Sequence, residues 1–143
     1  MNRLRVWVGR ALTILIALFC LFDAMGKLDL PAPVTESFQR LALPVSTAPL
    51  IAAALLISTL FYVIPRTALF GGILLTGYLG GAVSIHVRAG SSTFDTVFPI
   101  IFGLLAWTGL FLRHPYLAYV LIHGAEIPDE RAADTGAVNS TQK

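Results

Sequence analysis

Charge and cysteine are both scarce in this chain of 143 residues. Only 13% of the residues are charged, while 56% are hydrophobic, which is far from the balance of a soluble domain. The one cysteine, Cys20, excludes an intramolecular disulfide and a CxxC redox pair. The three histidines are scattered, so we expect no metal site and no haem or other cofactor held by this chain alone.

The lysines and arginines are also dispersed, although they give a net charge of +2. No basic cluster with interleaved aromatic residues is present, and this excludes a nucleic-acid-binding surface of the usual kind. We recognise no nucleophile with its base and acid, and no phosphate-binding loop. The chain is therefore not expected to be an enzyme on its own, and a role as a membrane subunit of an oxidoreductase stays open.

Long apolar runs are what the sequence has in place of charge. The run 69–88 reads LFGGILLTGYLGGAVSIHVR, and about 18 apolar residues suffice to cross the roughly 30 Å hydrocarbon core as a helix. We predict an all-α fold, an integral membrane four-helix bundle. Its spans are expected at about 6–23, 48–64, 68–86 and 97–113.

Prolines and polar residues mark the ends of these spans. Pro31 prevents continuation of the first helix, and a short helix with Phe38 on its apolar face is expected to lie in the interface plane. Thr67 is expected to cap the third span. Pro99 is expected in the first turn of the fourth span, after a polar loop at 89–95.

The chain divides into a membrane domain at 1–122 and a polar tail at 123–143, which we expect to be disordered. With four spans, both termini share one side of the membrane. Lysines and arginines favour that side as the cytoplasm: Arg3, Arg5, Arg10, Arg66, Arg113 and Arg131 against Lys27, Arg40 and Arg88. Arg66 would hold its tight turn inside. We expect a multi-pass protein of the bacterial inner membrane, with its first span uncleaved.

Small residues recur along one flank of the third span. They are Gly72, Thr76, Gly80 and Ser84, spaced by four, and the GxxxG pair Gly77 and Gly81. Small residues let helix backbones approach one another closely in membranes. We therefore expect all four glycines to be helix-packing positions.

Ionisable groups gather at the outer ends of the first and third spans. Asp23 and Lys27 are spaced i, i+4 and can pair on one helix face, while His86 and Arg88 end the third span at the same level. Such groups are costly at membrane depth and are either functional or paired. Two further polar side chains of the third span can hydrogen-bond a ligand. The candidate ligand-binding set is Asp23, Lys27, Thr76, Tyr78, His86 and Arg88.

Each of these residues also has a purely structural interpretation. Lys27 and Arg88 can simply extend to the outer headgroups, and Asp23 can pair locally. Thr76 can bond back to its own helix, and Tyr78 can pack between helices. On the sequence alone, a ligand site and a set of residues that only fix topology both stay open.

Three short motifs, in this order, resemble the DoxX-like family of small four-helix membrane proteins. They are FDAMGK at 22–27, IPRT at 64–67 and TGYLGGA at 76–82, the last followed by His86 and Arg88. The resemblance covers about residues 5–122. The residues that match the family pattern are Asp23, Lys27, Arg66, Gly77, Gly80, Gly81, His86 and Arg88. The family includes a relative of the small subunit of a thiosulfate:quinone oxidoreductase and proteins linked to redox-stress complexes, so the resemblance implies a quinone and a redox enzyme as partners.

Two functions follow from these observations. The first is an accessory membrane subunit that binds a quinone or another lipophilic molecule near Asp23 and His86 and works with a redox partner. The second is a structural or assembly protein without a ligand, in which polar residues set topology and glycines pack helices. Membrane lipids are expected partners in both cases. A homo-oligomer is compatible with either, and a small transporter would require one.

Overall fold

The computed structural model describes residues 3–123. Over this range the chain is helical and has no β-strand, and four helices are long and apolar enough to cross a membrane. These are α1 (Arg3–Asp29), α3 (Ala48–Val63), α4 (Ala68–Arg88) and α5 (Thr93–Arg113), with a short 3-10 turn η1 (Val45–Thr47) before α3. The predicted all-α bundle with four spans is confirmed. The predicted tail lies outside the described residues from residue 124 onward.

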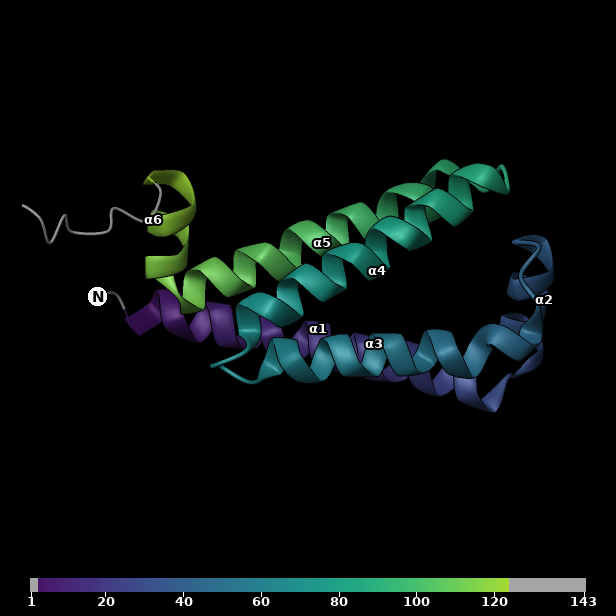
Figure 1. Ribbon diagram of the computed structural model, residues 1–143, viewed down its shortest axis with the longest axis horizontal. Coiled ribbons are helices and arrows are strands. Elements are labelled where there is room, and N and C mark those ends of the chain that lie inside the picture. Colours follow the sequence, from purple (N-terminus) through teal and green to yellow (C-terminus); the bar gives the residue numbers. More distant parts are fainter. Residues whose placement is uncertain (1–2, 124–143) are drawn as a thin grey trace, which may run out of the picture.

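Two short helices stand at opposite ends of the bundle (Figure 1). Helix α2 (Ala32–Arg40) joins α1 to η1, and α6 (Pro115–His123) follows α5. The helical conformation is interrupted between α1 and α2 at Leu30, which has a φ of 50°, and Pro31 then precedes α2. Phe38 on α2 is buried against the bundle, in keeping with the predicted apolar face.

The four long helices form two layers (Figure 1). Each packs against two neighbours, in the cyclic order α1, α3, α4, α5 and back to α1. The layer of α4 and α5 lies close to the layer of α1 and α3 at the α6 end, and the layers separate toward the α2 end (Figure 1). This divergence decides where side chains fill the interior and where space is left.

Glycines allow the two layers of helices to pack closely at the α6 end. A Cβ at Gly71 would collide with the backbone of Tyr62, and one at Gly9 would lie 2.9 Å from Cβ of Leu112. A Cβ at Gly109 would lie 3.2 Å from the Tyr62 hydroxyl oxygen. The backbones of α3 and α4, and of α1 and α5, therefore approach as closely as glycine allows.

Tyr62 and Arg113 lock this end of the bundle. The fully buried Tyr62 donates its hydroxyl proton to the Ala106 carbonyl oxygen over 2.7 Å. Arg113 Nη2 donates to the Tyr62 carbonyl oxygen at 3.0 Å, and its guanidinium lies 5.3 Å from the centre of the Tyr62 ring. That carbonyl lies in the last turn of α3, where helical partners are lacking and a positive charge is favourable. Arg113 thus has a structural role beyond membrane topology.

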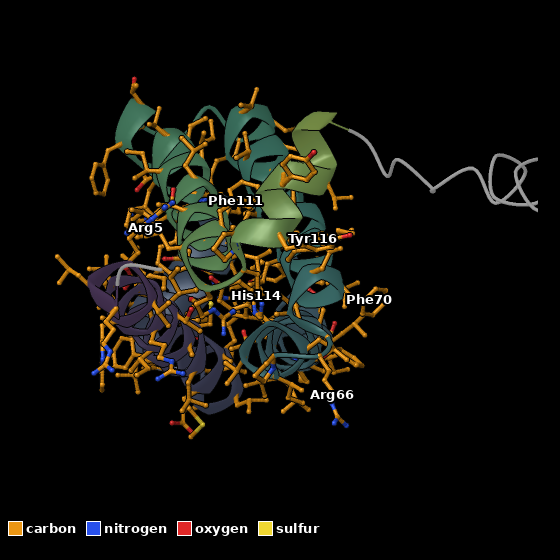
Figure 2. All side chains as sticks on the ribbon, turned by 90° about the vertical axis from the view of Figure 1, so that its left-hand side faces the viewer. Arg5, Arg66, Phe70, Phe111, His114 and Tyr116 are labelled. Atoms are coloured by element: carbon orange, nitrogen blue, oxygen red, sulfur yellow. The ribbon has the colours of Figure 1, made fainter. Side chains whose placement is uncertain are left out.

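Arg66, by contrast, is exposed in the turn between α3 and α4 and extends away from the helices (Figure 2). The hydroxyl of Thr67 donates to the Phe61 carbonyl oxygen at 3.0 Å and makes no capping hydrogen bond to α4. The expectation that its side chain caps the third span is therefore wrong, because the orphan carbonyls at the end of α3 compete for the hydroxyl.

The expectation that Pro99 lies in the first turn of the fourth span is also wrong. Helix α5 begins at Thr93, so the loop ends at residue 92 and Pro99 lies inside the helix. The Ser92 Oγ accepts from the Asp95 backbone N–H at 3.2 Å, which caps the helix before the apolar run starts. Likewise, α1 does not end at residue 23 but continues through Lys27 to Asp29, because the i, i+4 pair on it is compatible with helix.

Candidate functional site

A cavity of about 670 Å³ occupies the region where the two layers separate. Side chains from α1, α2, α3, α4 and α5 line it, most of them apolar. Its size is within the range of small-molecule sites, about 300–1,000 Å³. The polar side chains in its wall are Asp23, Lys27, Ser37, Tyr78 and His86.

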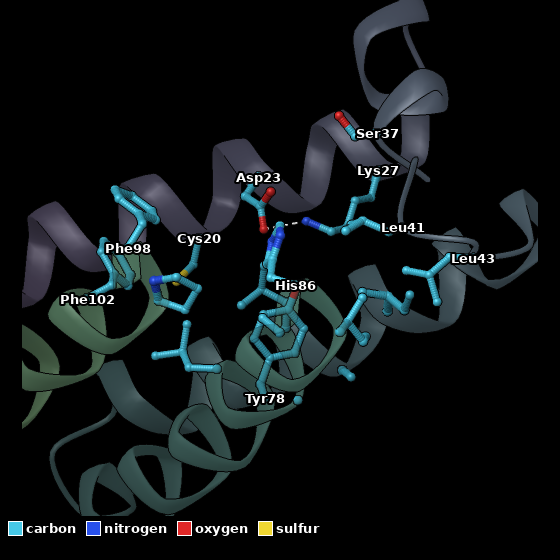
Figure 3. Close-up of a pocket in the computed structure, with 18 of the residues that line it drawn as sticks. Cys20, Asp23, Lys27, Ser37, Leu41, Leu43, Tyr78, His86, Phe98 and Phe102 are labelled. Atoms are coloured by element: carbon cyan, nitrogen blue, oxygen red, sulfur yellow. Dashed lines mark ion pairs between the residues drawn. The ribbon is translucent and has the colours of Figure 1, made fainter. Parts of the chain in front are cut away.

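The ion pair on α1 is the main polar feature of the cavity (Figure 3). Lys27 Nζ lies 2.5 Å from Asp23 Oδ2, and the two side chains are 15% and 37% exposed, respectively. The predicted pairing across one helical turn is confirmed. The pair carries no net charge, and an ammonium group has three donors, so Lys27 keeps donors for a further acceptor.

His86 and Tyr78 bring polar groups from α4 to the same cavity (Figure 3). His86 Nδ1 lies 3.1 Å from Ser91 Oγ in the loop after α4. This contact orients the ring, and within the described chain Nε2 has no hydrogen-bond partner. The Tyr78 hydroxyl likewise has none among residues 3–123. Both groups are therefore free to bind a ligand.

Two members of the predicted set lie elsewhere. The Thr76 hydroxyl donates to the Gly72 carbonyl oxygen and accepts from Trp107 Nε1, both at 2.8 Å, and so ties α4 to α5. The back-bonding that its structural interpretation predicts is confirmed. Arg88 is exposed and does not line the cavity. The structure thus brings together four of the six predicted ligand residues: Asp23, Lys27, Tyr78 and His86.

The glycines of α4 divide in the same way. A Cβ at Gly72 would lie 3.2 Å from Leu110, so this position packs against α5 as predicted. At Gly77, Gly80 and Gly81 a Cβ would meet nothing within 4 Å. Contrary to the prediction, these three positions do not pack against another helix of the described chain, because α4 has by then diverged from α3.

One wall of the cavity is aromatic, which we did not predict from the sequence. The Phe19 ring on α1 lies 5.5 Å from the Phe98 ring and 4.6 Å from the Phe102 ring, centre to centre. Phe98 and Phe102 are themselves stacked at 5.9 Å, and all three line the cavity together with Cys20. The i, i+4 spacing of phenylalanines from Phe94 onward was a sequence signal for this wall.

The chemistry of the site is that of a neutral binding pocket. Its charges are compensated within the ion pair, and its free groups are hydrogen-bond donors or a histidine ring beside flat aromatic surfaces. Among the described residues no three histidine, cysteine or carboxylate side chains are placed to hold a metal ion. The cavity suits an uncharged molecule with polar acceptor atoms and an apolar body.

Comparison with known protein families supports the resemblance of the motifs. The model of the DoxX-like family matches residues 11–109. Comparisons with curated proteins and with solved structures found no match. The matched segment contains every residue that lines the cavity and most of the four helices that can span a membrane. The chain therefore belongs to the DoxX-like family and is an integral membrane protein with four apolar helices.

Proposed function

We propose that this protein is an accessory subunit in the bacterial inner membrane, with both termini in the cytoplasm, that binds a quinone or a chemically similar lipophilic molecule and works with a redox enzyme. The observation that carries the proposal is the cavity itself. Within helices that can span a membrane, a neutral ion pair, a histidine and a tyrosine face one apolar space of about 670 Å³.

The charges of the cavity favour an uncharged head group. Asp23 and Lys27 neutralise each other, so an anionic phospholipid head would bring an uncompensated charge into an apolar site, which is costly. A quinone carbonyl is neutral and accepts hydrogen bonds. Lys27, Tyr78 and the His86 ring can supply them.

The apolar part of the cavity matches the remainder of such a molecule. Flat rings bind well against aromatic side chains in offset-stacked or edge-to-face arrangements. Phe98 and Phe102 present their rings beside Cys20, close to the ion pair (Figure 3). A ring bound there would place its carbonyl oxygens toward the donors of Lys27 and His86.

A titration tests the proposal. The protein in lipid nanodiscs is titrated with a decyl-substituted benzoquinone in a calorimeter, in parallel with His86→Ala, Tyr78→Phe and the control Arg88→Ala. Loss of one hydrogen bond of about 1.4 kcal/mol weakens binding about ten-fold, so we expect that loss for His86→Ala and a smaller one for Tyr78→Phe. Arg88, outside the cavity on the same helix end, should have no effect. Absence of binding by the parent, or equal affinities for His86→Ala and Arg88→Ala, would refute the site.

A structural role without a ligand is the second candidate, and one observation favours it: the ion pair closes within a single helix and needs no further partner. This function predicts that Asp23→Asn and His86→Ala leave the growth of a host that depends on the protein unchanged. A variant that disrupts packing, Gly71→Leu, should abolish it. A growth defect from either polar substitution would contradict the structural role.

A further inference from the structure

We propose that the ligand reaches the cavity sideways from the hydrocarbon layer, through the seam between α3 and α4 beside Gly77 and Gly81. The inference rests on the proposed function and narrows the ligand class. The ligand is then a molecule that dissolves in the bilayer, and not a water-soluble solute that enters past α2.

Residues at this seam both line the cavity and are exposed on the outer surface of the bundle. Gly77 and Gly81 line the cavity and are also exposed, and neither has a neighbour within 4 Å of where its Cβ would be. Across the seam on α3, Leu50 lines the cavity although 72% of its surface is exposed. Since α3 and α4 are antiparallel across a short turn, positions 50 and 54 lie level with positions 81 and 77. The cavity therefore opens here.

The other seams carry side-chain packing at this level. Between α1 and α5, the Phe19 ring contacts those of Phe98 and Phe102. Between α4 and α5, a Cβ at Gly103 would already lie 3.5 Å from the Leu79 side chain. Between α1 and α3, Ala24 and Ala52 are both 0% exposed and belong to the same buried core cluster.

Helix α2 stands at the aqueous end of the cavity. Helix α2 and the residues after it lie over that end and contribute Ser37, Phe38 and Leu41 to its wall. Phe38 is only 4% exposed, so its ring fills the space between α2 and the bundle.

The depth of the opening decides which molecules it admits. At 1.5 Å per residue, Gly77 lies about 14 Å and Gly81 about 20 Å along α4 from Ala68, inside a hydrocarbon layer of roughly 30 Å. Only a molecule that partitions into the bilayer is concentrated there. His86, further along α4, then receives its polar head.

Cys20, the only cysteine of the chain, makes the path measurable. It lines the cavity and is 2% exposed, so a reagent must enter the cavity to reach it. The protein in phosphatidylcholine vesicles is exposed to an apolar reagent, N-cyclohexylmaleimide, or to a sulfonated methanethiosulfonate, which is confined to water. The maleimide forms a thioether with Cys20, and the methanethiosulfonate forms a mixed disulfide with release of sulfinate. Intact mass reports the fraction of Cys20 modified by either reagent, and Cys20→Ser provides the blank.

The decisive comparison is between two neighbouring glycines. Gly80 and Gly81 are equally open to a larger side chain, but only Gly81 lines the cavity. We expect Gly81→Leu to slow alkylation by the apolar reagent about ten-fold, since about 1.4 kcal/mol of added barrier suffices. Gly80→Leu should react at the parent rate, and Gly81→Ala at an intermediate one. The charged reagent should modify none of the variants appreciably.

Several outcomes would overturn the proposal: equal rates for Gly81→Leu and Gly80→Leu, comparable modification by the charged reagent, or no alkylation of the parent chain. If Gly81→Leu fails to fold by circular dichroism, Gly77→Leu carries the same comparison. No ligand takes part in this experiment. If the Cys20 experiment contradicts the entry path but the quinone titration succeeds, the binding site is still supported. If the titration fails but the Cys20 experiment gives the expected rates, the entry path is still supported.

Discussion

Two glycines of α4 that look equivalent in the sequence should respond oppositely to alanine. At Gly71 the new Cβ would collide with backbone atoms of Tyr62 and Phe61, which cannot rotate away. The two helices must therefore separate beside the short turn that joins them. Overpacking costs about 1–3 kcal/mol even where only side chains move, so we expect Gly71→Ala to lower the free energy of unfolding by about 3 kcal/mol. At Gly80 nothing lies within 4 Å, and the lower flexibility of alanine should raise it by about 0.5–1 kcal/mol.

The measurement is reversible unfolding in mixed micelles with increasing sodium dodecyl sulfate, followed by far-ultraviolet circular dichroism. Parent and both variants are compared under the same conditions, so errors of extrapolation largely cancel. A Gly71→Ala protein within about 1 kcal/mol of the parent would refute the reasoning on close helix approach. If Gly80→Ala were clearly destabilised, the open flank of α4 would have to contact a second copy of the chain, as a homo-oligomer requires.

Two further predictions concern Arg113 and His114 at the α6 end of the bundle. Replacing Arg113 by Gln removes its contacts with the carbonyl and ring of Tyr62 and should lower the free energy of unfolding by about 1.5–3 kcal/mol in the same assay. The exposed Arg66→Gln should change it by less than about 0.5 kcal/mol, and equal effects would contradict this role for Arg113. Burial and the neighbouring Arg113 lower the pKa of His114. The unfolded chain, with a histidine pKa of about 6.5, then binds more protons than the folded one, so stability should fall as pH drops below about 6.5 and level off below the folded pKa. Unfolding curves across this range should lose that slope in His114→Gln, and a slope that persists there would assign it to another group.

Local sequence features predicted much of the fold because each depends on a few neighbouring residues. The lengths of the apolar runs predicted the number of membrane-spanning helices, and Pro31 predicted the break between α1 and α2. The misplaced ends have local causes as well. Ser92 and Asp95 form a cap that starts α5 before Pro99, and Thr67 turns its hydroxyl toward the preceding helix.

The candidate site was predicted in part for the same reason. The i, i+4 spacing of Asp23 and Lys27 on one helix was enough to predict their ion pair. Whether a residue of α4 reaches the cavity depends on which neighbour its side of the helix faces. Thr76 faces α5 and bonds to Trp107, whereas Tyr78 faces the cavity, and no pattern in the sequence distinguishes these two positions.

The sequence by itself determined that this is a membrane protein of four helices in the DoxX-like family, because hydrophobicity and short motifs are properties of the chain and not of its packing. Only the tertiary structure decided what the glycines of α4 do. Joined to α3 by a short turn, α4 is held close to α3 at Gly71 and diverges from it toward Gly77 and Gly81. The same residue type is therefore a packing contact near the turn and the edge of a cavity farther along, since distance from the turn sets the gap between the two helices.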